Sequence, residues 1–198
     1  MSNDAITQPP IQGFVRDEEA TEIIAEVIRR LSHARGPLTR FARVEDWGEG
    51  FRRYLASGDE QIPRVVAEQG QELYAKLCAS QVRPRLLHGD LQHYNILLDD
   101  ARGWTAIDPK GVVGEVEYEI GASLRNPWGR PDLFASAETV ERRLRRYEGA
   151  LSLDYDRALG WGFAQAVLSA IWMVEDGSAV DGGSPPILLA GAIRSMLE

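Results

Sequence analysis

The stretch LLHGDLQHYNILLDDARGWTAIDPKG, residues 86–111, decides how the middle of this 198-residue chain folds. Short apolar runs alternate in it with turn residues, which predicts short β-strands. The expected strands are RLLHG (85–89), YNILLD (94–99) and WTAID (104–108). The residues DDARG at 99–103 predict a hairpin between the last two strands. Asp90, Asn95 and Asp108 interrupt or end these runs, which suggests a chemical role for them.

Asp90 and Asn95 lie five residues apart in a loop whose two flanking runs we expect to be held in one small sheet. The next strand ends at Asp108, so its carboxylate should emerge beside that loop. Two carboxylates and an amide supply the hard oxygen ligands that Mg²⁺ prefers, with one carboxylate left to orient or deprotonate a hydroxyl group. Phosphoryl transfer needs this combination. Each residue taken singly is equally typical of a turn or a strand end.

Helical periodicity surrounds this central segment on both sides. Apolar residues recur at intervals of three and four, with acidic residues in the first turn of the first helix and Gly36-Pro37 after it. The expected helices cover residues 17–35, 44–56, 63–80, 137–149, 155–175 and 186–197. The predicted fold class is therefore α+β, mainly α, with one small β insertion that carries the polar loop.

The composition restricts the possible partners and the compartment. With 22 basic and 30 acidic residues the formal net charge is -8, which argues against nucleic acid or an anionic membrane as partner and permits a cationic one. Cys78 is the only cysteine, and we expect it to be buried and reduced. The N-terminus shows no secretory pattern, which indicates a cytoplasmic protein. Residues 1–16 are polar and aperiodic, and we expect a flexible leader there.

HGDLQHYN (88–95) followed by AIDPK (106–110) resembles the catalytic core of the aminoglycoside phosphotransferase superfamily, whose fold is similar to that of protein kinases. The longer match, from LLHGDLQHYNILLDD to GEVEYEIGASLRNP, most resembles the branch of streptomycin 6-kinases and hydroxyurea-resistance kinases. This resemblance covers the chain from about Asp17 to its end. It implies the C-terminal, helical lobe of a protein-kinase-like fold over residues 17–198, with the small β insertion carrying the catalytic loop.

The resemblance also implies roles for individual residues. Asp90 would be the catalytic base that faces the acceptor hydroxyl, and Asn95 and Asp108 would bind Mg²⁺, with Asp108 joining the metal to ATP. Lys110, in the DPK that replaces the kinase Asp-Phe-Gly, is a further candidate contact to the phosphates of ATP. His88 would tie the loop to the rest of the domain. We expect His93 to be an exposed loop residue.

The acidic run GEVEYEIG supplies candidate substrate-binding residues. Glu115 and Glu117 would hold a cationic acceptor, a role that agrees with the negative net charge. The alternative is that these acids only complement the dipole at the start of a helix.

No glycine-rich strand pair precedes the first predicted helix, and no lysine occurs before Lys76. We therefore expect the chain to resemble the C-terminal lobe without the β-rich nucleotide-binding lobe. The predicted function is transfer of the ATP γ-phosphate to an alcohol group of a small, aminoglycoside-like or streptomycin-like molecule, by a chain that is an incomplete form. The alternatives are a non-catalytic kinase-like binding module and a Mg²⁺-dependent phosphoesterase. An exposed lobe interface would also favour a homo-oligomer.

Overall fold

The computed structural model describes residues 16–32 and 37–197. The predicted leader, except Arg16, and the predicted end of the first helix at residues 33–35 lie outside these residues. The helices are α1 (Asp17–Leu31), α2 (Val44–Trp47), α3 (Glu49–Ser57), α4 (Arg64–Ala79), α5 (Val116–Glu119), α6 (Gly121–Leu124), α7 (Ala137–Leu151), α8 (Tyr155–Glu175) and α9 (Pro185–Leu197). The strands are β1 (Ala42–Arg43), β2 (Arg85–Leu87), β3 (Ile96–Asp99), β4 (Gly103–Ala106) and β5 (Val112–Gly114).

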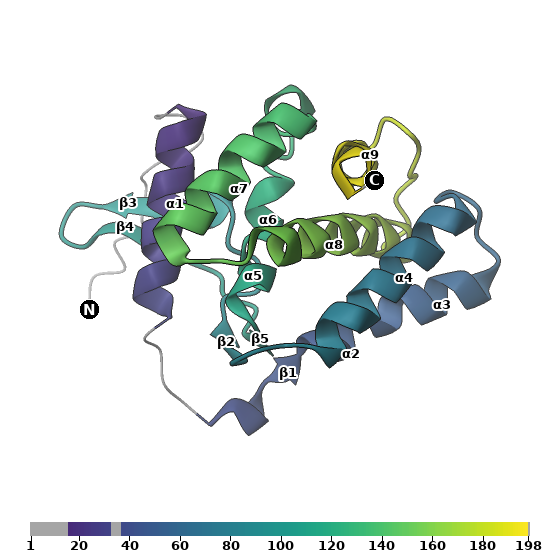
Figure 1. Cartoon of the computed structure of the whole chain (residues 1–198), viewed down its shortest axis with the longest axis horizontal. Helices are drawn as coiled ribbons and strands as arrows, with labels where there is room; N and C mark the ends of the chain where they lie inside the picture. The colour runs from purple at the N-terminus through teal and green to yellow at the C-terminus, as the bar shows by residue number, and fades with distance from the viewer. Residues whose placement is uncertain (1–15, 33–36, 198) are drawn as a thin grey trace.

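The long helices form where the periodicity of the sequence predicted them. α8 lies at the centre of their packing. Figure 1 shows α8 crossing the middle of the molecule, with α3 and α4 along one side and α9 beside it. By length and composition α8 could cross a membrane, but 78% of its most apolar window is buried inside the domain. The helix therefore serves as the core of the fold, with Trp161 fully buried in it.

The strands form two small sheets, so the expectation of one sheet around the polar loop is wrong. β3 and β4 pair antiparallel as the predicted hairpin, with Leu98 opposite Trp104. β2 pairs instead with β5, with Leu87 opposite Val112, and β5 also pairs with the two-residue β1. Neither β1 nor β5 was expected, because segments of two or three residues are too short to show a period. The polar loop thus passes from one sheet to the other.

A buried ion pair fixes α1 against α7, which lie side by side (Figure 1). Asp17 at the start of α1 accepts hydrogen bonds from Nε and Nη2 of Arg143, at 3.0 and 2.5 Å, and Arg143 is only 1% exposed. Nη1 of Arg143 donates to the carbonyl oxygens of Ser123 and Asn126, just beyond the central polar segment. These bonds satisfy the buried guanidinium and hold the end of α6 in place.

Gln165 connects α8 to the segment that follows β5. Its Nε2 donates to the carbonyl oxygen of Tyr118, and its Oε1 accepts from Nη1 of Arg125 at 3.3 Å. Gly121 lies directly against this side chain, and a Cβ atom added there would come within 2.4 Å of Cδ of Gln165. The close approach of α6 to α8 therefore requires glycine at this position.

Gly121→Ala should destabilise the protein by about 1–3 kcal/mol. The added methyl group displaces the buried Gln165 side chain, whose amide nitrogen and oxygen are both hydrogen-bonded. Gly149→Ala in α7 is the matched control, since a Cβ there has no neighbour within 4 Å. The control should be neutral or gain up to about 1 kcal/mol from helix propensity. Urea unfolding followed by circular dichroism measures both. Equal changes in the two variants would contradict the packing described here.

Candidate active site

Asp90 and Asn95 are held together at the junction of the two sheets. β2 ends at Leu87, and Gly89 turns the chain with a φ of 83°. Asn95, at the end of the short 3₁₀ turn His93–Asn95, donates from Nδ2 to the carbonyl oxygen of Asp90 at 2.8 Å and to its Oδ2 at 3.3 Å. The predicted base and the predicted amide ligand are therefore adjacent, as their spacing suggested.

His88 joins this loop to the segment that carries Asp108. Its Nδ1 accepts from the backbone amide of Asp90 at 3.3 Å, so Nε2 carries the hydrogen and donates to the carbonyl oxygen of Ile107 at 2.9 Å. The carbonyl oxygen of His88 accepts from the amides of Lys110 and Gly111, at 2.9 and 3.1 Å. Burial lowers the pKa of His88, which keeps the ring neutral in this role. The predicted structural role of His88 is confirmed.

The side chain of Asp108 extends into solvent next to the hydrogen bonds that His88 makes. The amide of Ile107 donates to the carbonyl oxygen of Asn95 at 2.9 Å, so Asp108 follows directly after a contact with the predicted ligand residue. Its backbone adopts a φ of 56°, and its side chain is 65% exposed. Oδ2 accepts from Nζ of Lys110 at 2.7 Å, and this hydrogen bond lowers the pKa of the Asp108 carboxyl.

A pocket of about 400 Å³ opens at Asp90. It is lined by Trp47, Gly89, Asp90, Lys110, Arg125 and Trp172. Arg125 is 8% exposed, and its Nη2 lies 3.7 Å from Oδ1 of Asp90. The rings of Trp47 and Trp172 meet edge to face, with centroids 5.8 Å apart. Sequence reasoning missed Arg125 and these two tryptophans, because only the fold brings them to the loop.

Glu119 holds the backbone of the loop that follows β2 through hydrogen bonds. Its Oε2 accepts from the amide of His88 at 2.6 Å and its Oε1 from the amide of Gly89 at 2.9 Å. The side chain is 4% exposed, and burial raises the pKa of its carboxyl to about 7. Sequence reasoning included this residue in the acidic run but favoured Glu115 and Glu117. The contact of Glu119 with the loop depends on β5 and its pairing with β2, which the sequence did not predict.

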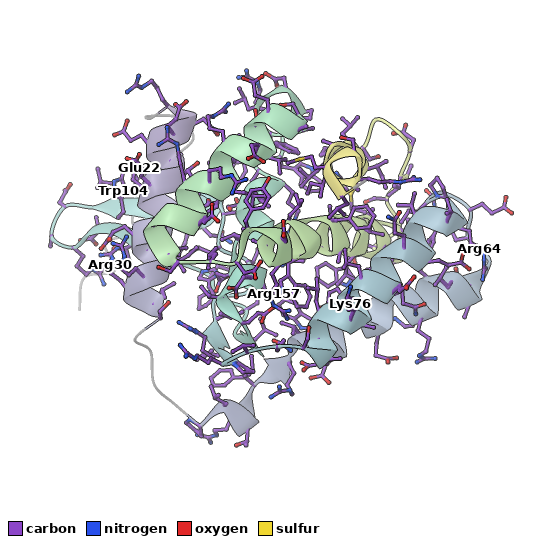
Figure 2. The ribbon with its side chains drawn as sticks, viewed as in Figure 1. Glu22, Arg30, Arg64, Lys76, Trp104 and Arg157 are labelled. Atoms are coloured by element: carbon purple, nitrogen blue, oxygen red, sulfur yellow. The ribbon has the colours of Figure 1, made fainter. Side chains whose placement is uncertain are left out.

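The structure does not bring Glu115 and Glu117 to the Asp90 pocket. Glu115 is 1% exposed, and its Oε1 accepts from Nε of Arg157 at 2.5 Å and from the ring of Trp161. Figure 2 shows Arg157 at the start of α8, where it also donates to α4. Both glutamates line a separate pocket of about 560 Å³. Their role in acceptor binding stays a prediction, and for Glu115 the carboxylate is already used inside the fold.

The expectation that His93 is exposed is wrong. Its side chain is 3% exposed, because the 3₁₀ turn directs the ring inward, near Arg143 and Asp17. Burial lowers the pKa of His93 to about 3, so the ring is neutral at ordinary pH. Among the described residues no hydrogen-bond partner reaches its Nδ1. His93 is therefore part of the core and no candidate ligand.

The oxygen atoms at this site suit Mg²⁺. Asn95 uses its Nδ2 for Asp90, which leaves its Oδ1 available. The exposed Asp108 follows Ile107, whose amide donates to the carbonyl oxygen of Asn95. Within residues 16–32 and 37–197 no group of three or more His, Cys, Asp or Glu side chains could hold a metal ion. Mg²⁺ commonly takes only one or two protein ligands and completes its shell with water and substrate phosphates. The pair of Asn95 and Asp108 fits that pattern.

The fold belongs to the kinase-like class. A solved structure of a thermostable mutant of aminoglycoside phosphotransferase APH(4)-Ia matches with a TM-score of 0.65 and 15% sequence identity. The match covers 97% of this chain and 71% of that one. At this level of identity the likeness establishes the fold.

The family follows from the sequence. The family model "Aminoglycoside/hydroxyurea antibiotic resistance kinase" matches residues 10–177. Streptomycin 3''-kinase of Klebsiella pneumoniae is 33% identical over 82% of this chain and 60% of its own length, and streptomycin 6-kinase of Streptomyces griseus is 35% identical over 81% and 53%. The chain belongs to this family of antibiotic resistance kinases, which confirms the resemblance. It spans roughly half to three fifths of the length of these relatives.

Glu119→Gln should destabilise the domain by about 1–3 kcal/mol at pH 8, because one carboxylate oxygen becomes an amide donor that faces a backbone N–H. Amide hydrogen exchange at His88 and Gly89 should accelerate. Glu117→Gln, on the same helix, is the control, since its carboxylate accepts from the amide of Asp154 at a long 3.4 Å and does not bind the loop amides. Urea unfolding and exchange monitored by NMR test both variants. Unchanged exchange at His88 and Gly89 in Glu119→Gln would show that the loop is held by other contacts.

Proposed function

We propose that this chain carries the base and the metal ligands of a cytoplasmic, ATP-dependent phosphotransferase that phosphorylates a hydroxyl group of a small molecule. One observation carries the proposal: Asn95 is hydrogen-bonded to both the backbone and the carboxylate of Asp90. A base and a metal ligand are thereby held on one rigid loop beside the exposed Asp108. Membership of the resistance kinase family supports the same assignment.

In this proposal Asp90 is the catalytic base. Its side chain is 29% exposed at the pocket, and it is oriented by Asn95 on Oδ2 and by Arg125 near Oδ1. The acceptor hydroxyl gives its proton to the Asp90 carboxylate as its oxygen bonds to the γ-phosphorus of ATP, and ADP leaves with the electrons of the broken bond. Bound to Asn95 and Asp108, Mg²⁺ would supply neutralisation of the phosphate charge. Arg125 would then lie close to the negative charge of the transferred phosphate beside Asp90.

The acceptor we propose is a cationic aminocyclitol of the streptomycin type. Three similar proteins are named for streptomycin and one for hydroxyurea. Trp47 and Trp172 line the pocket beside Asp90, and a sugar ring or a guanidinium group can stack on an indole ring there. The net charge of -8 attracts such a cation from solution.

Asp90→Asn should reduce the rate of phosphate transfer about 10²–10⁴-fold, because the amide cannot accept the proton. The protein is incubated with Mg²⁺, ATP and either streptomycin or hydroxyurea, and the mass of the acceptor is followed. Asp132→Asn is the control, since Asp132 is exposed and pairs only with Arg130. Equal turnover in Asp90→Asn and the wild type would refute the assigned base. A protein that binds ATP and acceptor without any transfer would favour the non-catalytic binding module.

A further inference from the structure

Lysine is rare in this chain, and one lysine stands at the candidate metal site. Of the 22 basic residues only Lys76 and Lys110 are lysines. Arginine makes the buried pairs with Asp17 and Glu115, whereas lysine pairs with Asp108. Lysine carries a compact point charge on a flexible stem, while arginine grips a carboxylate with a planar fork. This difference suggests that the ion pair between Lys110 and Asp108 can separate readily.

Hydrogen bonds hold the backbone of Lys110, but the side chains of Lys110 and Asp108 are exposed. The amide of Lys110 donates to the carbonyl oxygen of His88, and Gly111 completes the turn with a φ of 71°. Beyond these backbone contacts, the side chains of Lys110 and Asp108 are 48% and 65% exposed. Exposed ion pairs contribute little net stability, so Nζ can leave Asp108 without disturbing the fold.

Lys110 also belongs to the wall of the Asp90 pocket. Its ammonium contacts the carboxylate of Asp108 at 2.7 Å, and the side chain also borders the space over Asp90. A divalent cation bound to the Asp108 carboxylate repels this ammonium, which occupies Oδ2 of the same group. Once displaced, the ammonium can turn toward Asp90, the carboxylate that lines the same pocket.

We propose that Lys110 acts as an exchangeable counterion of Asp108: it neutralises this carboxylate in the metal-free protein and moves over Asp90 when a divalent cation binds. There it contacts the phosphate being transferred. This inference rests on the proposed function, because that proposal names Asp108 as a metal ligand. It adds that metal binding and phosphate contact are coupled through one side chain. The ammonium and the metal are therefore competitors for Asp108.

The competition is measured by Mn²⁺ binding to the protein without nucleotide, from the electron paramagnetic resonance signal of free Mn²⁺. Lys110→Met should bind Mn²⁺ about fivefold more tightly, the effect of removing one neighbouring charge at an exposed site. Lys110→Arg should bind it more weakly than wild type, because the guanidinium competes with two hydrogen bonds. Lys76→Met is the matched control. Lys76 is exposed on α4 (Figure 2), and its loss changes the net charge equally.

The release of Lys110 is measured by acylation with a lysine-selective reagent and mass spectrometry, with Lys76 as internal reference. Mg²⁺ should raise the ratio of acylation at Lys110 to that at Lys76, because the ammonium loses its carboxylate partner. Addition of ATP with Mg²⁺ should lower the ratio again. A ratio that does not respond to Mg²⁺ would overturn the inference.

The outcomes separate this inference from the proposed function. If Lys110→Met binds Mn²⁺ no more tightly than wild type, or if neither protein binds it at millimolar concentration, Lys110 is no competitor and the inference fails. The proposed function is judged by phosphate transfer in Asp90→Asn, a variant in which Lys110 is unchanged. If Asp108→Asn keeps full Mn²⁺ affinity, the metal ligand assignment fails and the inference fails with it. Support requires tighter binding in Lys110→Met together with an unchanged Lys76→Met.

Discussion

The buried carboxylate of Glu119 supports the whole candidate site, because it accepts the backbone amides of both His88 and Gly89. A carboxylate in the core is costly unless its oxygens are hydrogen-bonded, and here two amides satisfy it. The loop must pass close to the core to make these bonds, which requires glycine at position 89: a Cβ there would meet Trp47 and Val112 at 2.9 and 3.0 Å. The position of Asp90 follows from this contact.

The site combines a hydrogen-bonded half with a solvent-exposed half. Asp90 and Asn95 are joined by two hydrogen bonds in a loop that is clamped by His88. Asp108 and Lys110 are exposed and bonded mainly to each other. Phosphoryl transfer depends on alignment of the base, which suits the hydrogen-bonded half. Cations and nucleotides must enter and leave, which suits the exposed half.

The helices and the hairpin could be predicted from the sequence, because periodicity and turn residues are local signals. The juxtaposition of Asp90 and Asn95 was predicted from their spacing. β5 could not be predicted, since its three residues, two valines and a glycine, show no period. The burial of His93 and the convergence of Arg125 with Trp172 result from contacts between distant segments. The acidic run after β5 was recognised, but only the fold shows that Glu119, rather than Glu115, supports the loop.

Paramagnetic broadening by Mn²⁺ tests the central claim most directly, namely that Asn95 and Asp108 bind a divalent cation next to Asp90. The NMR signals of the Asn95 side-chain amide and of the Asp108 backbone amide should broaden at the lowest Mn²⁺ concentrations, since broadening falls steeply with distance from the metal. The amides of Glu117 and Asp154, in the separate acidic and arginine-lined pocket, should stay sharp at those concentrations. Broadening that begins at Glu117 and Asp154 while Asn95 stays sharp would contradict the account.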